Sequence, residues 1–452
     1  MTRIAFSTLG CKVNQYDTSL MQSSINGTGA YIIVPFDDEA DIYVVNTCTV
    51  TGKGDVESRR LIRRAIRRNK KARVIVTGCY AQTRPEEIAK IDGVSMVLGN
   101  EEKYAFMDYL THSGEDSNDH KTFVGDSFNT FNIPQRCLTN FPKRTRSFLK
   151  VQDGCDSRCS YCIVPFARGG SRSLNPDDVM KQISALSQNG HKEIVLCGVH
   201  LGGYGRDISP RISLTSLIDK ILSETDILRI RLSSIEPREI TEELINIVAS
   251  EDRICKHFHI PLQSGDDYTL RQMNRNYTSA FFEDLILRIR ERTENAGIGC
   301  DVMVGYPGEE DYHFGNTYRF IERLPVTYLH VFAYSPRSGT AAYYKRETVN
   351  GDIKRKRSDA IRSLGEKKKI AFQTNFIGKV VEVLIEEEED EVTGMFKGYT
   401  GNYLRVLVSP FSKGKEGEFL AGKGKLINVQ LSGIVNDNLS GEVLSDSITH
   451  HS

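Results

Sequence analysis

The sequence predicts a three-domain α/β protein. It should contain an open α/β domain of the Rossmann or flavodoxin kind, a partial (β/α)6 barrel and a small all-β barrel. Three observations predict this fold class. Apolar strands alternate with amphipathic helices in the first quarter of the chain, the same alternation returns six times in the middle, and short alternating strands with glycine turns follow residue 376. The length of 452 residues allows about three domains with separate cores.

The first domain is predicted over residues 1–112. Residues 3–7, 41–46 and 73–77 read as buried strands, and a short turn and helix-like sequence follow each of them. This order is typical of an open α/β sheet. Residues 113–140 are rich in Ser, Asp, Asn and Thr with weak periodicity, and we interpret them as a linker.

The second domain is predicted over residues 141–371. Its strands should start near residues 147, 193, 229, 257, 300 and 328. Helical sequence separates them, for example at 214–222 and 281–292, and a basic helical segment at 354–369 closes the domain. Six strand–helix units in a row predict an incomplete parallel barrel, whose chemistry lies at the carboxyl ends of the strands.

The third domain is predicted over residues 373–437. Residues 379–384, 403–408 and 425–430 alternate apolar and polar side chains and are separated by glycine-containing turns. A small closed barrel of OB-like size fits this pattern.

The composition narrows the functional classes. The chain has 59 basic and 59 acidic residues, so a polyanionic partner must be met by local patches. The first residues turn polar before an apolar signal region can form, and no apolar run approaches the roughly 20 residues that span a bilayer. We expect a cytoplasmic protein without a membrane partner. In that compartment, grouped cysteines indicate metal more often than disulfides.

The strongest motif is the cysteine triad Cys155, Cys159 and Cys162, spaced C-x3-C-x2-C. Three thiolates can hold three corners of a cubane iron–sulfur cluster and leave its fourth iron open. A structural zinc site needs four ligands, and no fourth Cys or His lies in this segment. The triad resembles the signature of the radical S-adenosylmethionine (SAM) enzymes. In those enzymes, the open iron binds SAM and an electron from the cluster cleaves it to a 5′-deoxyadenosyl radical.

A second set comprises Cys11, Cys48 and Cys79. These cysteines are distant in sequence, but each follows a predicted strand of the first domain. Open α/β sheets place their ligand crevice just beyond the carboxyl strand ends, so the three thiols could meet there and hold a second cluster. The alternative is three separate buried thiols, the usual role of a lone cysteine.

Nearly the whole chain resembles the methylthiotransferases of the radical SAM superfamily. In that family an amino-terminal domain holds an auxiliary [4Fe–4S] cluster on three such cysteines. A radical SAM core holds the second [4Fe–4S] cluster, and a carboxy-terminal TRAM domain binds RNA. The resemblance therefore implies clusters at both cysteine sets and SAM as cofactor. One SAM molecule would donate a methyl group to sulfur on the auxiliary cluster, and another would supply the radical.

Short motifs resemble one branch of this family, MtaB, which converts N6-threonylcarbamoyladenosine at tRNA position 37 to its 2-methylthio derivative. Residues 46–51 read NTCTVT, and residues 8–14, 77–82 and 166–169 (TLGCKVN, TGCYAQ and FARG) point the same way. The isopentenyladenosine branch is expected to read closer to NTCSIRE, and the ribosomal-protein aspartate branch closer to NTCGFI. The resemblance implies a tRNA substrate, an electron donor such as flavodoxin or ferredoxin, and a sulfur source.

Polar residues at the barrel strand ends are candidates for SAM binding. By resemblance, Arg172, Glu236 and Gln263 lie near SAM, and Tyr161 approaches its adenine. Ser234 and Val304 close two further predicted strand ends and complete the candidate set. Ordinary loop and helix capping is the alternative reading of these residues.

RNA contact is expected from basic patches. Arginines recur every three to four residues along one predicted helix, with no acid between residues 59 and 73; the candidates are Arg60, Arg63, Arg64 and Arg67. A solvated helix face is the ordinary alternative. Arg337, in the segment FAYSPRSGTAA at 332–342, is a further candidate for substrate contact. A non-catalytic iron–sulfur protein that binds RNA is the alternative from another functional class.

Overall fold

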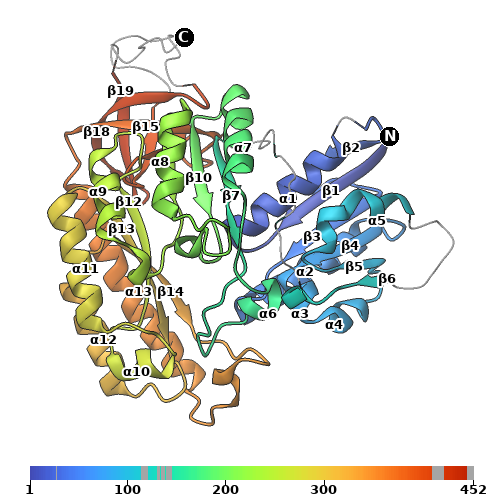
Figure 1. Cartoon of the computed structure of the whole chain (residues 1–452), viewed down its shortest axis with the longest axis horizontal. Helices are drawn as coiled ribbons and strands as arrows, with labels where there is room; N and C mark the ends of the chain where they lie inside the picture. The colour runs from blue at the N-terminus through green and yellow to red at the C-terminus, as the bar shows by residue number, and fades with distance from the viewer. Residues whose placement is uncertain are drawn as a thin grey trace.

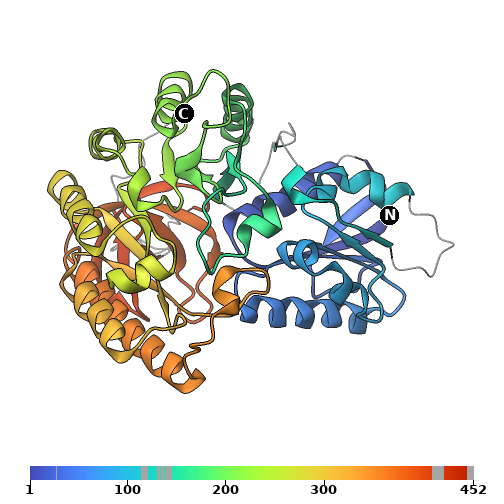
Figure 2. The same ribbon diagram turned by 60° about the horizontal axis from the view of Figure 1, so that its bottom comes forward.

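The computed structural model describes residues 1–26, 28–112, 121–129, 133, 138, 145–409 and 422–444. It confirms the predicted fold class: an open α/β domain, a partial parallel barrel and a closed β-barrel (Figure 1). The first domain flanks the partial barrel in both views (Figures 1 and 2). Within the described residues, no helix is both long and apolar enough to cross a lipid bilayer.

The first domain is a six-stranded parallel sheet in the order β2-β1-β3-β4-β5-β6. Its strands are β1 (Thr2–Thr8), β2 (Tyr31–Val34), β3 (Ile42–Thr47), β4 (Arg73–Gly78), β5 (Met96–Leu98) and β6 (Lys121–Phe123). Its helices are α1 (Lys12–Ile25), α2 (Gly52–Arg68), α3 (Cys79–Thr83), α4 (Pro85–Ala89) and α5 (Phe106–His112). Ile62 and Ala65 of α2 pack on one face of the sheet, and Met21 of α1 and Phe106 of α5 pack on the other.

One strand lies where the sequence predicted a linker. Residues 121–123 form the edge strand β6, which pairs with β5. Phe123 packs with the core on the α5 face of the sheet. Part of the predicted 113–140 linker therefore belongs to the first domain, and most of the remainder lies outside the described residues.

The partial barrel consists of two three-stranded parallel sheets, in the orders β11-β10-β7 and β12-β13-β14, joined by the parallel bridge between Ile230 and Ile254. Its strands are β7 (Arg146–Lys150), β10 (Glu193–Cys197), β11 (Arg229–Leu232), β12 (His257–Gln263), β13 (Gly297–Val304) and β14 (Tyr328–Ala333). The helices that follow them are α7 (Pro176–Gln188), α8 (Leu214–Glu224), α9 (Glu242–Ser250), α11 (Ser279–Arg292), α12 (Asp311–Arg323) and α13 (Gly351–Thr374). Shorter elements lie at the carboxyl strand ends: the hairpin β8 (Gln152–Asp153) and β9 (Arg172–Ser173), α6 (Val164–Arg168) and α10 (Asp267–Gln272).

The third domain is a closed barrel of mostly antiparallel strands, in the order β15-β16-β17-β19-β18. Its strands are β15 (Val380–Glu389), β16 (Phe396–Thr400), β17 (Arg405–Val408), β18 (Leu426–Val435) and β19 (Asn438–Val443). β19 extends past the predicted end at residue 437. Asn436 and Asp437 both have positive φ, the conformation of a tight hairpin turn, and so join β18 to β19.

The third domain is attached where the core strands begin. Arg231 of β11 donates to the carbonyl oxygens of Thr400 and Gly401, each at 3.0 Å. Arg146, the first residue of β7, pairs with Glu386 at 2.7 Å, and its guanidinium lies 4.1 Å from the centroid of the Tyr399 ring. The closed barrel therefore lies at the amino ends of the core strands, opposite the loops that carry Cys155, Cys159 and Cys162.

Candidate iron–sulfur and cofactor site

The structure brings Cys11, Cys48 and Cys79 to one edge of the first sheet. They follow β1, β3 and β4, which are neighbours in the sheet. Gly10 has a φ of +93°, and a Cβ on it would lie 2.8 Å from the Cys48 Sγ. A glycine is needed at this position because the Cys48 side chain lies directly over it.

Asn14 connects the loops that carry these cysteines. Its Nδ2 donates to the carbonyl of Leu9 at 2.8 Å and to the carbonyl of Thr47 at 2.9 Å, just before Cys11 and Cys48. The Cys79 thiol lies 4.0 Å from the Asn14 Oδ1. One buried amide in the first turn of α1 thus holds three chain segments that are far apart in sequence.

Cys155, Cys159 and Cys162 lie on the loop that follows β8. Gly154 has a φ of +70°, and a Cβ there would lie 1.8 Å from the Gly170 carbonyl oxygen. The Cys155 N–H donates to the Gly169 carbonyl at 3.0 Å. Ser160 fixes the middle of the loop, because its Oγ hydrogen-bonds to the Gln272 carbonyl and the Tyr306 hydroxyl.

Each set contains a thiol whose pKa is raised by burial. Burial, followed by the neighbouring thiols of Cys79 and Cys11, raises the pKa of Cys48 to about 12. Burial also raises the pKa of Cys162 to about 12. Since the thiolate is the ligand, these side chains would be protonated without a metal, and metal binding would release their protons. Each set offers three thiols, the number that leaves one iron of a cubane cluster open.

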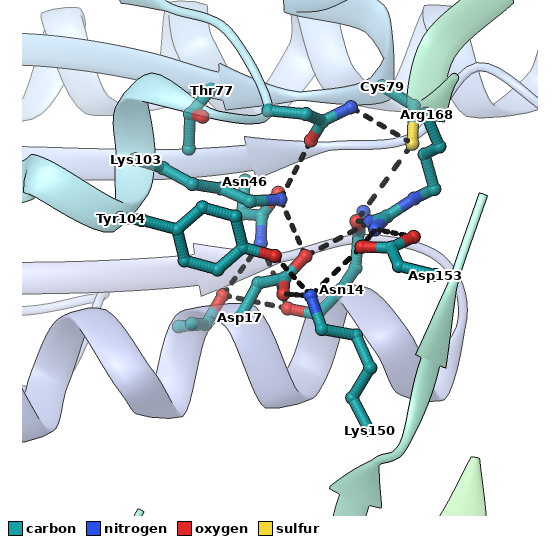
Figure 3. Close-up of polar contacts among 12 residues, drawn as sticks. Asn14, Asp17, Asn46, Thr77, Cys79, Lys103, Tyr104, Lys150, Asp153 and Arg168 are labelled. Carbon is teal, nitrogen blue, oxygen red and sulfur yellow. Dashed lines mark hydrogen bonds and ion pairs between the residues drawn. The ribbon is translucent and has the colours of Figure 1, made fainter. Parts of the chain in front are cut away.

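A buried ionic network joins the two sets (Figure 3). Asp17 of α1 accepts from Lys103 at 2.5 Å and from Lys150 at 2.6 Å. Arg168 of α6 donates to both carboxylate oxygens of Asp153 at 2.9 Å, and also to Asp17 at 3.1 Å. All five side chains are almost completely buried. We call Asp17, Lys103, Lys150, Asp153 and Arg168 the buried ionic network.

The network touches the cysteine loops at both ends. Asp153 precedes Gly154 and Cys155, and its Oδ1 accepts from the Gly154 N–H at 2.8 Å. Arg168 also donates to the Asn14 Oδ1 at 2.5 Å, next to Cys79 (Figure 3). The two cysteine sets are therefore held by one connected group of charges and amides.

A polar cavity of about 530 Å³ opens beside the Cys155 loop. Arg275 lines it, donates to the Cys159 Sγ at 3.3 Å and forms an ion pair with the half-buried Glu236. His200 lies on the same cavity. Burial disfavours its charged form, yet hydrogen bonds to Cys155 and Glu239 raise the pKa of His200 to about 10. The cavity thus brings guanidinium and imidazole groups together with carboxylates next to the Cys155 loop.

A second cavity, of about 560 Å³, lies between the first domain and the partial barrel. Thr49, next to Cys48, and Ile163, next to Cys162, both line it, as do Phe166 and Arg337. We call it the interdomain cavity. A neighbour of one cysteine from each set therefore lines the same cavity.

The predicted cofactor residues have varied environments. Ser234 is exposed, whereas Tyr161 packs beside Tyr306 and Tyr334. Gln263 ends β12 with a φ of +64° and is half-buried. The Val304 side chain is buried in the barrel core, so only its backbone is placed to contact a ligand. None of these positions establishes a cofactor contact, and their roles stay predictions.

Arg172 and Arg337 each connect the barrel to the first domain. Arg172 pairs with Glu101 at 3.1 Å. Arg337 is buried and pairs with Asp55 of α2, and Ser335 accepts from the Gly52 N–H at 3.0 Å. Contact of Arg337 with RNA stays a prediction; the structure gives its guanidinium a protein carboxylate as partner.

The predicted arginines on α2 are exposed, on the face opposite Ile62 and Ala65. Arg64 shares the carboxylate of Asp37 with Arg68, and Arg60 lies 3.6 Å from Glu57. Among the described residues, Arg63 and Arg67 form no ion pair within 4.0 Å. The helix therefore presents cations to solvent as predicted.

Sequence reasoning missed four polar residues of this site: Asn14, Asp153, Arg168 and Arg275. Their partners are remote in sequence, such as the 154 residues between Asn14 and Arg168. The signal available was Arg168 itself, since it lies in the FARG motif directly after the cysteine loop.

Comparisons with protein families divide the chain in the same way as the structure. Residues 3–99 match the uncharacterized protein family UPF0004, and residues 149–321 match the radical SAM superfamily. The chain is 39% identical to the threonylcarbamoyladenosine tRNA methylthiotransferase MtaB of Bacillus subtilis, over 100% of this chain and 99% of that protein. It is 38% identical to the MtaB protein of Aquifex aeolicus, over 90% of this chain and 100% of that protein.

Two further comparisons are more distant. A tRNA-2-methylthio-N(6)-dimethylallyladenosine synthase of Natranaerobius thermophilus is 29% identical over 98% of this chain and 97% of that protein. Among solved structures, the radical S-adenosylmethionine methyltransferase TsrM from Kitasatospora setae, with cobalamin and a [4Fe–4S] cluster bound, aligns with a TM-score of 0.56. It is 16% identical and covers 76% of this chain and 77% of that chain. This likeness concerns the fold.

Proposed function

The chain belongs to the MtaB family of radical SAM tRNA methylthiotransferases, and we propose that it converts N6-threonylcarbamoyladenosine at tRNA position 37 to the 2-methylthio derivative. The observation that supports this proposal is the presence of two three-cysteine sets, which the buried ionic network connects and of which one neighbour each, Thr49 and Ile163, lines the interdomain cavity. Methylthiolation needs a radical source and a sulfur carrier, and two sites of three thiols supply a place for each.

Each cysteine set has a separate proposed role. Cys155, Cys159 and Cys162 hold the SAM-binding [4Fe–4S] cluster, and Cys11, Cys48 and Cys79 hold the auxiliary one. When bound, the two clusters and SAM supply reductive cleavage of the sulfonium, a methyl group and the sulfur that is transferred.

The protein residues bind and orient these groups. Glu236 and Arg275 line the cavity beside the open iron, where a carboxylate and a guanidinium can meet the amino and carboxylate groups of SAM. The Arg275 donation to Cys159 stabilises negative charge on that sulfur. The barrel contact through Arg337 and Asp55 closes one side of the interdomain cavity.

The substrate base enters the interdomain cavity after leaving its stack, since residues next to Cys48 and Cys162 line that cavity. The exposed α2 arginines contact phosphates of the tRNA. The closed barrel at residues 380–443 acts as the TRAM domain that binds RNA. An electron donor such as flavodoxin or ferredoxin and a sulfur source complete the reaction, which takes place in the cytoplasm where the tRNA is.

The decisive experiment is mass spectrometry of nucleosides from total tRNA, with and without the gene. Loss of methylthio-threonylcarbamoyladenosine and gain of its unthiolated precursor support the proposal. Loss of methylthio-isopentenyladenosine instead would leave the family intact and overturn the substrate. Loss of methylthiolation on a ribosomal protein would have the same meaning, and no change in any of the three would favour a non-catalytic RNA-binding protein.

The cluster roles are tested with Cys48→Ala, using Cys300→Ala as a control because Cys300 lies in the barrel core. Cys48→Ala should lower the iron content of the anaerobic protein from about eight to about four per chain. It should still cleave SAM but form no methylthio product. Full modification by this variant would exclude the auxiliary cluster from Cys48.

A further inference from the structure

Three potential metal ligands lie on neighbouring strands of the partial barrel, away from both cysteine sets. They are His259 of β12, Asp301 of β13 and His330 of β14, and their ligand atoms all lie within 4.8 Å of one another. Asp301 is paired with His330 in the strand register, and Pro261, two residues after His259, is paired with Asp301. Side chains alternate between the faces of a strand. Cys300 and Val302 pack into the core under the helices, so these three side chains belong to the opposite, inner face.

The two separations that involve Asp301 are close to those in a tetrahedral metal site. The His259 Nε2 lies 3.0 Å and the His330 Nδ1 lies 3.4 Å from the same Asp301 oxygen. Zinc bonds to nitrogen and oxygen of about 2.0–2.1 Å at tetrahedral angles place neighbouring ligand atoms roughly 3.3 Å apart. An ion can therefore enter this group with small adjustments of the side chains.

A further contact orients one of the ligands. The Tyr328 hydroxyl lies 3.1 Å from the His259 Nδ1 and 2.8 Å from the His257 Nε2. A partner on Nδ1 leaves the Nε2 of His259 directed at Asp301. Metal-binding histidines normally have such a partner on the second ring nitrogen, which fixes the ring and its tautomer.

The group is accessible from solvent. The His330 side chain is 53% exposed and lines a cavity of about 490 Å³ between the barrel and the third domain. An ion can thus reach the group from solvent.

The group is separate from the proposed SAM site. His259 lies four residues before Gln263, the end of β12, which corresponds to about 13 Å along the strand. Neither cysteine set contributes to it.

We propose that His259, Asp301 and His330 bind one divalent transition-metal ion, of which zinc fits the ligands best. Two imidazoles and one carboxylate are ligands that zinc accepts, and one of them, His330, lines the solvent-accessible cavity. The bound ion links β12, β13 and β14 beneath the site of the chemistry. The competing explanation is a carboxylate that simply accepts hydrogen bonds from two histidines.

The test uses anaerobic holoprotein with both clusters in place, so that zinc cannot occupy the cysteine sets. Equilibrium dialysis against radioactive zinc, with acid-labile sulfide measured in parallel, should give one zinc per chain in the wild type. His259→Ala and His330→Ala should each abolish that binding while sulfide stays unchanged. Tyr328→Phe, which removes only the orienting hydroxyl, should weaken binding by roughly 10–100-fold.

His313→Ala is the matched control, because His313 lies on α12 and stacks on Tyr268. It should bind zinc as the wild type does. Since His330 is exposed, its replacement should leave the circular dichroism spectrum and the thermal transition without zinc unchanged. The proposal is overturned if the wild type binds no zinc at micromolar concentration, or if zinc binding is the same in His330→Ala.

Discussion

Replacement of Asp17 by asparagine tests the buried ionic network most directly. The side chain is fully buried and contacts Lys103, Lys150 and Arg168. Asparagine has nearly the same shape but removes the charge and turns one acceptor oxygen into a donor. Three buried cations are then left with Asp153 as the remaining fully buried carboxylate of the network.

The loss of one buried negative charge should lower the free energy of unfolding. Removing one partner from a buried ion pair destabilises proteins by about 3–5 kcal/mol, because the charge left behind is neither solvated nor paired. With a urea dependence of about 2–3 kcal/mol per molar, the unfolding midpoint should fall by roughly 1–2 M. Circular dichroism should be used to follow unfolding, since the chain contains no tryptophan.

Asp37→Asn provides the matched control. Asp37 also contacts two arginines, Arg64 and Arg68, but its side chain is 61% exposed. Water screens this pair, so its loss should cost less than about 1 kcal/mol. If Asp17→Asn were as stable as Asp37→Asn, the inference that the network stabilises the contact between the domains would be wrong.

Two further predictions concern the cysteine loop and acid stability. Gly154→Ala should remove about half of the cluster iron, because the added Cβ would overlap the Gly170 carbonyl. Gly190 is the control: it also has a positive φ but no neighbour within 4 Å, so Gly190→Ala should retain the iron. For Glu193, burial is outweighed by Arg231 and other arginines, which lower its pKa to about 2. Its stabilisation of about 3 kcal/mol is therefore present above about pH 4 and lost as the pH falls towards 2. Between pH 5 and 2, the free energy of unfolding should fall less in Glu193→Gln than in the wild type. If it fell equally in both proteins, the assignment of this pH dependence to Glu193 would be wrong.

The main fold elements could be predicted because their signals are local. Strands β1, β3 and β4 have buried apolar runs, and the sequence located them within a residue or two. β2, by contrast, is four residues long and exposes Ile32 and Ile33, and β5 has only three residues. Such short strands are formed by their neighbours in the sheet rather than by their own sequence.

The site could be predicted only in part, for the same reason. A thiol just after a strand of a parallel sheet is a local pattern, and the structure brings Cys11, Cys48 and Cys79 to one edge of the sheet. The partner of Arg337, however, lies 282 residues away, and that of Arg275 on Cys159 lies 116 residues away. No local pattern distinguishes such a buried arginine from one that contacts phosphate.

The attachment of the closed barrel by Arg231 and Arg146 sets a distance that an RNA must match. Arg146 is the first residue of β7, whereas the interdomain cavity lies beyond the carboxyl ends of the core strands. Strands of four to eight residues separate the two places by roughly 20 Å. An RNA held by the barrel therefore delivers a base to the cavity only if its anticodon arm spans that length. If the closed barrel binds the RNA as proposed, this fixed spacing would select a nucleotide by its position in the RNA as well as by its chemistry.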